Sequence, residues 1–125
     1  IGGAMAYTFL ASQGVPTGAS LVEKDKVKFA GELLERAKAR RKRILLPLDH
    51  KVTKSIKDTA SLKTTEGTAI SDGWMGVDIG PKTVLAYAQE LQKAKTIFWN
   101  GPMGVFETPE FSEGTFAMAK AICET

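Results

Sequence analysis

Cysteine and histidine are almost absent from this chain, which has one of each among its 125 residues. The single cysteine, Cys123, excludes an internal disulfide and is compatible with a reducing compartment. One cysteine and one histidine also cannot form the usual zinc site within one chain. No apolar run approaches the roughly 20 residues that a membrane span needs, and the amino terminus lacks the pattern of a signal peptide. We therefore expect a globular domain with no membrane partner.

Positive charge is concentrated in one short run. The net charge of +3 comes largely from residues 38–43, KARRKR. Such a run could bind nucleic acid or phosphate, but it stands at the end of a predicted helix, where cations interact favourably with the helix dipole. No aromatic residues interleave with it, as binding of single strands would require. An exposed helix end without a nucleic-acid partner is the favoured interpretation.

Two helices are predicted in the first third of the chain. The first runs from Gly3 to about Gln13 and is stopped by Gly14. Ser20 and Glu23 have the spacing of a capping box, which predicts the start of a second, long helix. The apolar face of that helix consists of Val27, Ala30, Leu33, Leu34 and Ala37.

Strands are expected at two apolar runs, residues 44–48 and 96–100, separated by helical and polar segments. The alternation of helices and strands predicts a parallel sheet covered by helices. Residues 51–71 are polar and rich in Lys and Thr, which indicates a loop or a small antiparallel ribbon. The fold class is therefore α/β.

Two more helices follow. Pro81 can occupy the first position of a helix that runs to about Lys95, and Thr108-Pro109-Glu110 predicts the start of the last helix. The expected buried stripes are Val84, Leu85, Ala88 and Leu91 in the first, and Phe116, Ala119, Ile122 and Cys123 in the second.

The segment from Thr96 to Glu107, TIFWNGPMGVFE, carries the most specific signal. In parallel α/β folds, ligands bind outside the carboxyl ends of strands, which is where Asn100 stands. Gly101 and Gly104 allow close approach of the backbone to a ligand, and Glu107 supplies a carboxylate that can accept hydrogen bonds from a ribose diol. The alternative is an ordinary surface loop.

This segment resembles the nucleotide-binding loop of the phosphoglycerate kinase family. Residues 1–10 (IGGAMAYTFL) resemble the family's glycine-rich turn, and residues 73–81 (GWMGVDIGP) resemble the loop that enters the next helix on the nucleotide side. Residues 46–49 (LPLD) resemble the end of a family strand. The resemblance continues over essentially all 125 residues.

The resemblance implies ten nucleotide-binding residues. Positions at the adenine match Gly3, Ala4, Gly76 and Val77, with Ala4 standing where many members have glycine. Positions along the ribose and phosphates match Asn100, Pro102, Gly104, Val105, Phe106 and Glu107. No catalytic residue and no protein ligand of a metal is expected in this chain.

The resemblance further implies an incomplete Rossmann-like three-layer parallel sheet, with residues 1–125 forming part of the nucleotide-binding domain of a cytoplasmic, monomeric glycolytic enzyme. That enzyme, a phosphotransferase with a carboxyl group as acceptor, moves a phosphoryl group between 1,3-bisphosphoglycerate and ADP, giving 3-phosphoglycerate and ATP. Mg²⁺ accompanies ADP/ATP, and the glycerate substrates bind an amino-terminal domain outside this chain. We expect a fragment that is inactive alone.

Several of these residues have structural interpretations as well. Gly76 and Gly80 could be turn glycines with positive φ, and Trp74 is expected in the core. Asp78 is expected to cap a helix or stabilise the turn near Pro81 rather than to bind a metal. His50 stands where the family often has an apolar residue, and an ordinary surface histidine is expected.

Two other functions are alternatives to this one. A nicotinamide dinucleotide domain is disfavoured because GGAMAY lacks the third glycine of the fingerprint, and the expected acidic residue falls inside a predicted helix. A non-catalytic nucleotide-binding or interaction module of the same fold stays open.

Overall fold

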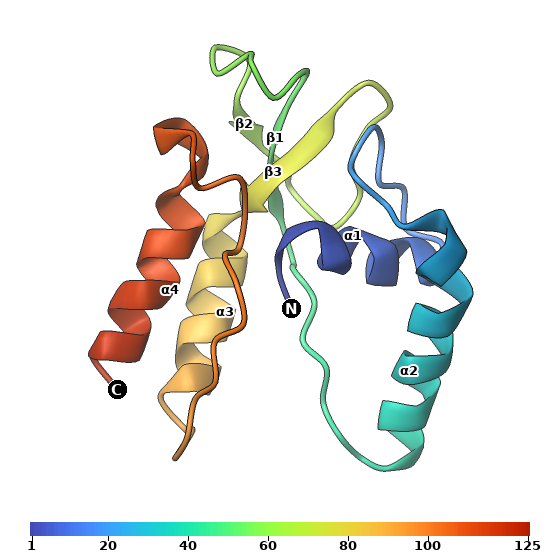
Figure 1. Cartoon of the computed structure of the whole chain (residues 1–125), viewed down its shortest axis with the longest axis vertical. Coiled ribbons are helices and arrows are strands. Elements are labelled where there is room, and N and C mark those ends of the chain that lie inside the picture. Colours follow the sequence, from blue (N-terminus) through green and yellow to red (C-terminus); the bar gives the residue numbers. More distant parts are fainter.

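A computed structural model describes all 125 residues and shows two pairs of helices on either side of a small sheet (Figure 1). One pair consists of α1 (Gly3–Ser12) and α2 (Val27–Ala39), and the other of α3 (Pro81–Leu91) and α4 (Glu113–Cys123). The strands between them are β1 (His50–Thr53), β2 (Lys63–Thr64) and β3 (Met75–Ile79). Short 3-10 turns at Lys24–Lys26 and Pro109–Phe111 precede α2 and α4. No helix is long and apolar enough to span a membrane.

The hydrogen-bonded sheet is antiparallel, which corrects the predicted parallel sheet. Its order is β2-β1-β3, with Lys51 opposite Thr64 on one side and opposite Asp78 on the other. The expected ribbon within residues 51–71 is confirmed by β1 and β2, whereas residues 73–81 contain a strand, β3, and not only a loop. Residues 44–48 and 96–100 belong to no strand, because a strand needs hydrogen-bonded neighbours and the only sheet lies elsewhere. The α/β class itself is confirmed.

Three segments, namely residues 1–3, the stretch around Leu45 and the stretch around Met103, nevertheless lie side by side and run in the same direction (Figure 1). The terminal ammonium of Ile1 donates to the carbonyl of Leu45 over 2.8 Å, and the amide of Gly3 donates to the carbonyl of Met103 over 3.1 Å. The hydroxyl of Tyr87 donates to the carbonyl of Ile1 as well. Residues 1–3 therefore lie between Leu45, in the predicted strand 44–48, and Met103, which follows the predicted strand 96–100.

A buried carboxylate caps α3 from outside the helix. Asp49, 1% exposed, accepts from the amides of Lys82 and Thr83 over 3.0 Å each and from the Thr83 hydroxyl over 2.7 Å. Pro81 does occupy the start of this helix, as predicted. The helix ends at Leu91 rather than near Lys95, and Leu85 of the expected buried stripe is exposed.

Asp78 performs the same task for α4. Its carboxylate accepts from the amide of Gly114 over 2.7 Å and from its own neighbour, Ile79, over 2.8 Å. Burial raises the pKa of Asp78, and these two amides and the ammonium of Lys51 oppose that shift. The capping role expected for Asp78 is therefore present, but at the start of α4 rather than near Pro81. Thr108 forms no side-chain cap, because α4 starts later, at Glu113.

The predicted capping box is also wrong. The 3-10 turn separates Glu23 from α2, and neither Ser20 nor Glu23 caps a helix through its side chain. The hydroxyl of Ser20 instead accepts from the amide of Gly76, 2.8 Å away across the fold. The amide of Glu23 donates to the Thr8 hydroxyl. The two residues that the local pattern assigned to a cap therefore form hydrogen bonds with residues distant in the sequence.

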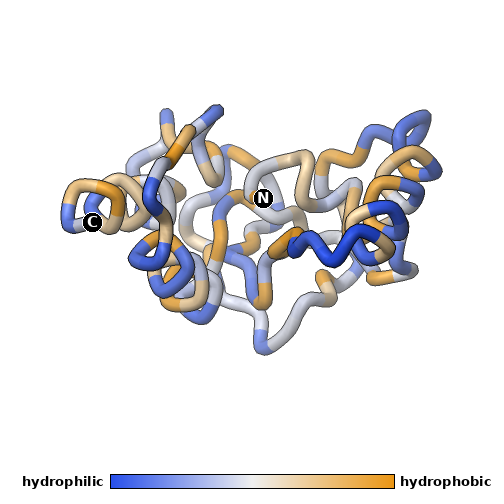
Figure 2. The backbone as a smooth tube through the Cα atoms, turned by 90° about the horizontal axis from the view of Figure 1, so that it is seen from below, coloured by the Kyte–Doolittle hydropathy of each residue, from blue (hydrophilic) through white to orange (hydrophobic).

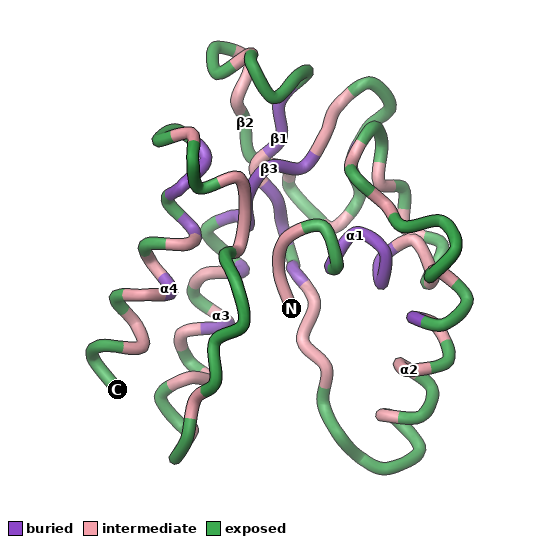
Figure 3. The backbone as a smooth tube through the Cα atoms, viewed as in Figure 1, coloured by how far each residue is buried: buried purple, intermediate pink, exposed green.

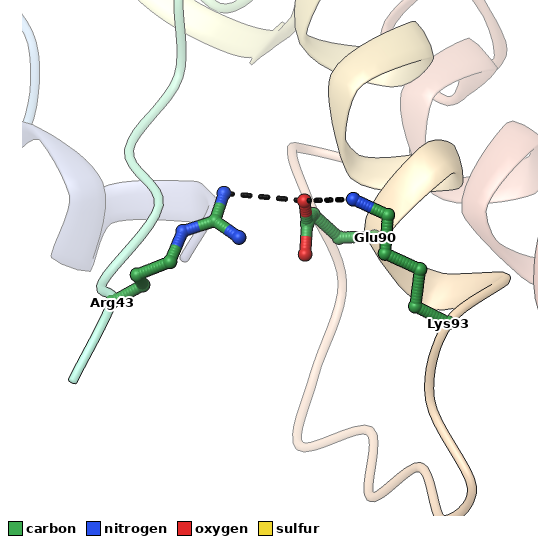
Figure 4. Close-up of polar contacts among 3 residues, drawn as sticks. All are labelled: Arg43, Glu90 and Lys93. Atoms are coloured by element: carbon green, nitrogen blue, oxygen red, sulfur yellow. Dashed lines mark hydrogen bonds and ion pairs between the residues drawn. The ribbon is translucent and has the colours of Figure 1, made fainter.

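The basic run lies exposed beyond the end of α2, as predicted, and one member reaches across the molecule. The guanidinium of Arg43 lies 3.2 Å from the carboxylate of Glu90 on α3, and the ammonium of Lys93 lies 3.0 Å from the same oxygen (Figure 4). Hydrogen bonds from Lys93 and Arg43 lower the pKa of Glu90. This contact joins the two helix pairs at the edge away from the sheet.

The core is split into two small clusters. Tyr7, Leu10, Val52 and Ile70 pack beside α1, while Ile79, Tyr87 and Met118 pack beside α3 and α4. Figure 3 shows that burial is concentrated near the sheet and that the far ends of the helices are exposed. Figure 2 shows hydrophobic residues distributed along both helix pairs. Phe116 and Cys123 of α4, expected in the core, are exposed.

We predict that the isolated chain associates or melts with little cooperativity. Only 23 of 125 residues are buried, while Phe98 is 87% exposed and Phe116 is 64% exposed, so apolar surface is available for self-association. Sedimentation and a thermal melt of the pure chain are the measurements. A Phe98→Ser variant should associate less. A sharp melt of a clean monomer would contradict the prediction.

Candidate functional site

One cavity of about 480 Å³ lies between the start of α1, the strand β3 and the 100–107 loop. Nine of the ten residues singled out from the sequence line it, and they come from three separate parts of the chain: Gly3, Ala4, Gly76, Val77, Asn100, Pro102, Gly104, Val105 and Glu107. Phe106 is the exception, because it does not line the cavity and is 45% exposed on the loop.

Gly101, predicted to allow close approach of the backbone to a ligand, also lines the cavity. Six further lining residues have no predicted role: Gly2, Met5, Tyr7, Leu21, Ile56 and Met75. Tyr7 stands four positions after Gly3 on α1, so helical periodicity could have placed it on the same face. Leu21 and Ile56 lie in irregular segments. No local pattern in the sequence indicates that these two approach the cavity.

Backbone hydrogen bonds fix the loop against the rest of the site. The amide of Val105 donates to the carbonyl of Val77 over 2.8 Å, and the amide of Met103 donates to the Thr115 hydroxyl over 3.1 Å. Gly101 has a φ of 129°, which favours glycine. Asn100 and Glu107 remain exposed. The loop is therefore fixed at its centre and presents its polar side chains to solvent.

Gly104 is required by close packing of two backbone segments. A Cβ placed there would lie 2.3 Å from the carbonyl oxygen of Val77 and 2.8 Å from the Cα of Asp78. Both are backbone atoms and cannot move aside cheaply. Gly104 thus has a structural reason of its own, since it brings the loop onto β3, and the approach of its backbone to a ligand stays a prediction.

Gly76 and Gly80 are not the positive-φ turn glycines that the structural interpretation expected. A Cβ on Gly76 would lie 2.2 Å from the hydroxyl oxygen of Tyr7, and one on Gly80 would lie 2.3 Å from the carboxyl carbon of Asp49. Each glycine makes room for a buried side chain. For Gly76, that side chain is itself part of the cavity wall.

The chemistry of the lining is apolar, with a polar edge. Its side chains include the carboxylate of Glu107, the amide of Asn100 and the hydroxyl of Tyr7, and no lysine, arginine or histidine is among them. No group of three histidine, cysteine or acidic residues could hold a metal ion. Such a lining suits a flat apolar group with hydrogen-bonding edges, but it cannot by itself balance several negative charges.

His50 is fully buried, at 0% exposure, which corrects the expected surface position. Its ring lies 5.6 Å from that of Tyr7, and burial lowers the pKa of its imidazole. Trp74, expected in the core, is only half-buried: it packs against the cluster beside α1, and the ammonium of Lys63 lies 4.0 Å from its ring centre. That distance allows a cation–π interaction.

Comparison with known proteins places the whole chain in one family. Residues 1–125 match the family described as phosphoglycerate kinase. The phosphoglycerate kinase of Bdellovibrio bacteriovorus is 56% identical over 125 residues, all of this chain and 31% of that protein. The one of Anaeromyxobacter sp. (strain K) is 57% identical over 122 residues, or 98% of this chain and 31% of the relative. The chain thus spans about a third of the length of these relatives.

Solved structures agree with the sequence comparison. The phosphoglycerate kinase of Coxiella burnetii superposes with a TM-score of 0.91 at 36% identity, covering 99% of this chain and 32% of that one. The enzyme of Pyrococcus horikoshii OT3 gives a TM-score of 0.81 at 32% identity, covering 97% and 31%.

Proposed function

The chain belongs to the phosphoglycerate kinase family, and from this premise we propose that it carries part of the ADP/ATP site of a phosphoglycerate kinase. The reaction is phosphoryl transfer between 1,3-bisphosphoglycerate and ADP in glycolysis, with 3-phosphoglycerate and ATP as products. Residues 1–125 form part of the nucleotide-binding domain, and the glycerate substrates bind a domain outside this chain. The complete enzyme acts as a cytoplasmic monomer.

The observation that carries the proposal is the convergence of residues 3–4, 76–77 and 100–107 on one cavity. These segments are far apart in the sequence, and each was chosen from its own resemblance to a nucleotide-binding loop. A chance set of loop residues has no reason to meet at one place. The nearly uncharged lining supports adenosine as the bound part, because adenine is flat and mostly apolar while ribose needs hydrogen-bond acceptors.

Each group then has a defined role. Gly3, Ala4, Gly76 and Val77 contact the adenine, and Glu107 accepts hydrogen bonds from the ribose hydroxyls. Asn100, Pro102, Gly104 and Val105 follow the ribose and the phosphates, with Asn100 nearer the phosphates. Phe106 belongs to the same loop contact, although in the free chain it lies exposed and outside the cavity lining.

Mg²⁺ fits this site only as a partner of the nucleotide. The lining offers one carboxylate, whereas Mg²⁺ usually takes several oxygens from phosphates, water and one or two acidic side chains. When bound, the ion neutralises phosphate charge during transfer. The residues present in this chain hold the base and the sugar, and the protein ligand of Mg²⁺ lies outside it.

To measure these residues in a complete enzyme, the chain can replace the matching segment of the Bdellovibrio bacteriovorus relative, which is 56% identical over this stretch. We call this protein the exchanged enzyme. It contains every residue discussed above together with the remaining two thirds of a phosphoglycerate kinase. The proposed function requires that it bind MgADP and form ATP from 1,3-bisphosphoglycerate. An exchanged enzyme that folds but does neither would refute the proposal.

Glu107→Ala in the exchanged enzyme should weaken MgADP binding by about 1.5–3 kcal/mol, because a charged acceptor of ribose hydroxyl bonds is lost. This corresponds to a Kd roughly 10 to 150 times higher in a calorimetric titration. Asn100→Ala should act similarly and also lower turnover.

The matched control is Glu110→Ala, an exposed carboxylate three residues further on that does not line the cavity. It should bind MgADP like the unmodified protein. Affinity for 3-phosphoglycerate, measured alone, should be the same in all these variants. Equal losses of MgADP affinity in Glu107→Ala and Glu110→Ala would point to a general charge effect and against a ribose contact.

A further inference from the structure

His50 occupies a fully buried position, which disfavours a charged side chain. It is 0% exposed, and its Nε2 lies 3.0 Å from the carbonyl oxygen of Thr68. A carbonyl only accepts, so Nε2 carries the proton and Nδ1 of the neutral ring bears a lone pair. Nδ1 is the one buried side-chain nitrogen or oxygen without a hydrogen-bond partner. A second proton on the ring would therefore be a buried N–H with nothing to accept it.

The ring of His50 supports the wall of the candidate cavity through Tyr7. The two ring centres are 5.6 Å apart and the ring planes are tilted by 56°, within the range of favourable aromatic contacts. Tyr7 is 5% exposed, lines the cavity, and approaches Gly76 so closely that even a methyl group could not fit between them. Because Tyr7 and Gly76 are closely packed and both line the cavity, a displacement of Tyr7 changes the shape of the cavity wall.

Few charges face His50. Asp49, its neighbour in the chain, favours the protonated ring, but its carboxylate already accepts three hydrogen bonds at the start of α3. Lys51, the next residue in the chain, forms an ion pair with Glu113 of α4. The charge of Asp78 on β3 helps to raise the pKa of Tyr7. In the segment that supplies Thr68, Glu66 is exposed. Of these groups only Asp49 favours an imidazolium at His50, and burial of the ring outweighs it.

We propose that His50 is a positioning residue for the nucleotide cavity, which holds Tyr7 in place only while its imidazole is neutral. MgADP affinity thereby depends on pH through a group that never touches the ligand. Protonation of Nδ1 creates a buried cation beside the ring of Tyr7 and an N–H with no acceptor, so the packing of the two rings must rearrange. The hydrogen bond from Nε2 to the Thr68 carbonyl is retained and favours the charged ring, but burial outweighs it. This inference rests on the proposed function, because it assigns a pH response to the same nucleotide site.

The direction of the effect follows from linkage. Burial lowers the pKa of His50 below its ordinary value of 6.5, so the folded cavity takes up the proton less readily than the unfolded chain. The stabilising effect of neutral His50 is complete above pH 6.5 and is lost as the pH falls below that value. Nucleotide that selects the neutral form loses affinity in the same direction. Since the pKa is below 6.5, the loss between pH 7.5 and pH 5.5 stays under about tenfold.

The test compares MgADP binding by the exchanged enzyme and its His50→Phe variant at pH 7.5 and pH 5.5. Phenylalanine keeps an aromatic ring against Tyr7 but cannot titrate. The phosphates of ADP titrate equally for both proteins, so their effect cancels in the ratio of the two Kd values. We expect affinity to fall more in the unmodified protein than in His50→Phe, by a factor of up to about ten. His50→Gln, neutral and polar, should also lose this extra dependence.

A second readout needs no binding comparison between variants. The imidazole resonance of His50, identified by its absence from the His50→Phe spectrum, gives its pKa with and without saturating MgADP. By reciprocity, the nucleotide should lower that pKa further. A histidine with a purely structural role would titrate at the same pH in both states.

The outcomes separate the two proposals. If the unmodified protein does not bind MgADP at pH 7.5, the proposed function fails and this inference fails with it. If it binds, but the pH dependence equals that of His50→Phe and the pKa is unchanged by nucleotide, the role of His50 alone is refuted. Should His50→Phe fail to fold, His50→Gln and the unmodified protein's pKa shift decide the question.

Discussion

Gly104→Val in the exchanged enzyme is expected to lower MgADP affinity about 100-fold or more and to destabilise the domain by about 2–4 kcal/mol. The reason lies in β3: a Cβ at this position meets the carbonyl oxygen of Val77 at 2.3 Å and the Cα of Asp78 at 2.8 Å. The loop must move away, which breaks the 2.8 Å hydrogen bond from the Val105 amide to Val77. Calorimetric titration of MgADP and a thermal melt measure the two effects.

Three other glycine variants separate the causes. Gly104→Ala already introduces the colliding Cβ, so it should show most of the destabilisation. Gly101→Ala meets no neighbouring atom but imposes a φ of 129° on a residue with a side chain, a strain of about 1–3 kcal/mol. Gly67→Ala has open space and an ordinary φ, and should be neutral. If Gly104→Val loses affinity with an unchanged melting temperature, the glycine serves only the ligand.

The candidate site was more predictable than the fold around it. Loop chemistry is local: Asn-Gly-Pro after an apolar run and a carboxylate a few residues on mark a binding loop wherever the strands end. The resemblance of three such loops then identified nine lining residues. Tyr7, Leu21 and Ile56 were missed because an apolar side chain that lines a cavity has the same sequence pattern as one that lines the core.

The errors in the fold have a common physical cause, namely dependence on distant partners. Residues 96–100 have the composition of a buried strand, yet Phe98 is 87% exposed because no strand of this chain pairs there. Ser20 was predicted as a cap from its local spacing, but its hydroxyl binds the amide of Gly76, 56 positions away. The carboxylates of Asp49 and Asp78 cap helices that begin more than 30 residues later. Local patterns contain none of these pairings.

His50 shows how a departure from a family pattern can be misjudged. A histidine where relatives often have an apolar residue suggested a tolerant surface position. The structure instead keeps the position buried and gives the ring one anchor, the Thr68 carbonyl, and one aromatic neighbour, Tyr7. His50 thus places a titratable group in a buried environment. Only the three-dimensional arrangement links that group to the cavity.

The isolated 125-residue chain is expected to make no ATP from 1,3-bisphosphoglycerate and MgADP. Phosphoryl transfer depends on positioning and on cations that stabilise charge on the transferred group. The cavity lining contains no lysine, arginine or histidine, and the chain has no cluster that could hold a metal ion. A chain that binds only the base and the sugar leaves the negative charge of the phosphates without compensating cations. It also does not position the acyl phosphate for transfer. A coupled assay of ATP formation with the pure chain, against a blank without protein, is the measurement.

The exchanged enzyme is the control that gives a negative result its meaning. There the same 125 residues are joined to the remainder of a phosphoglycerate kinase, so the groups that bind the glycerate substrate and the phosphates are present. ATP formation by the exchanged enzyme, with none by the chain, shows that the segment is competent but insufficient. Turnover by the chain above the blank, abolished by Glu107→Ala, would mean that the cavity itself stabilises the charge of the transferred group. The proposal that this stabilisation comes from residues outside the chain would then be wrong.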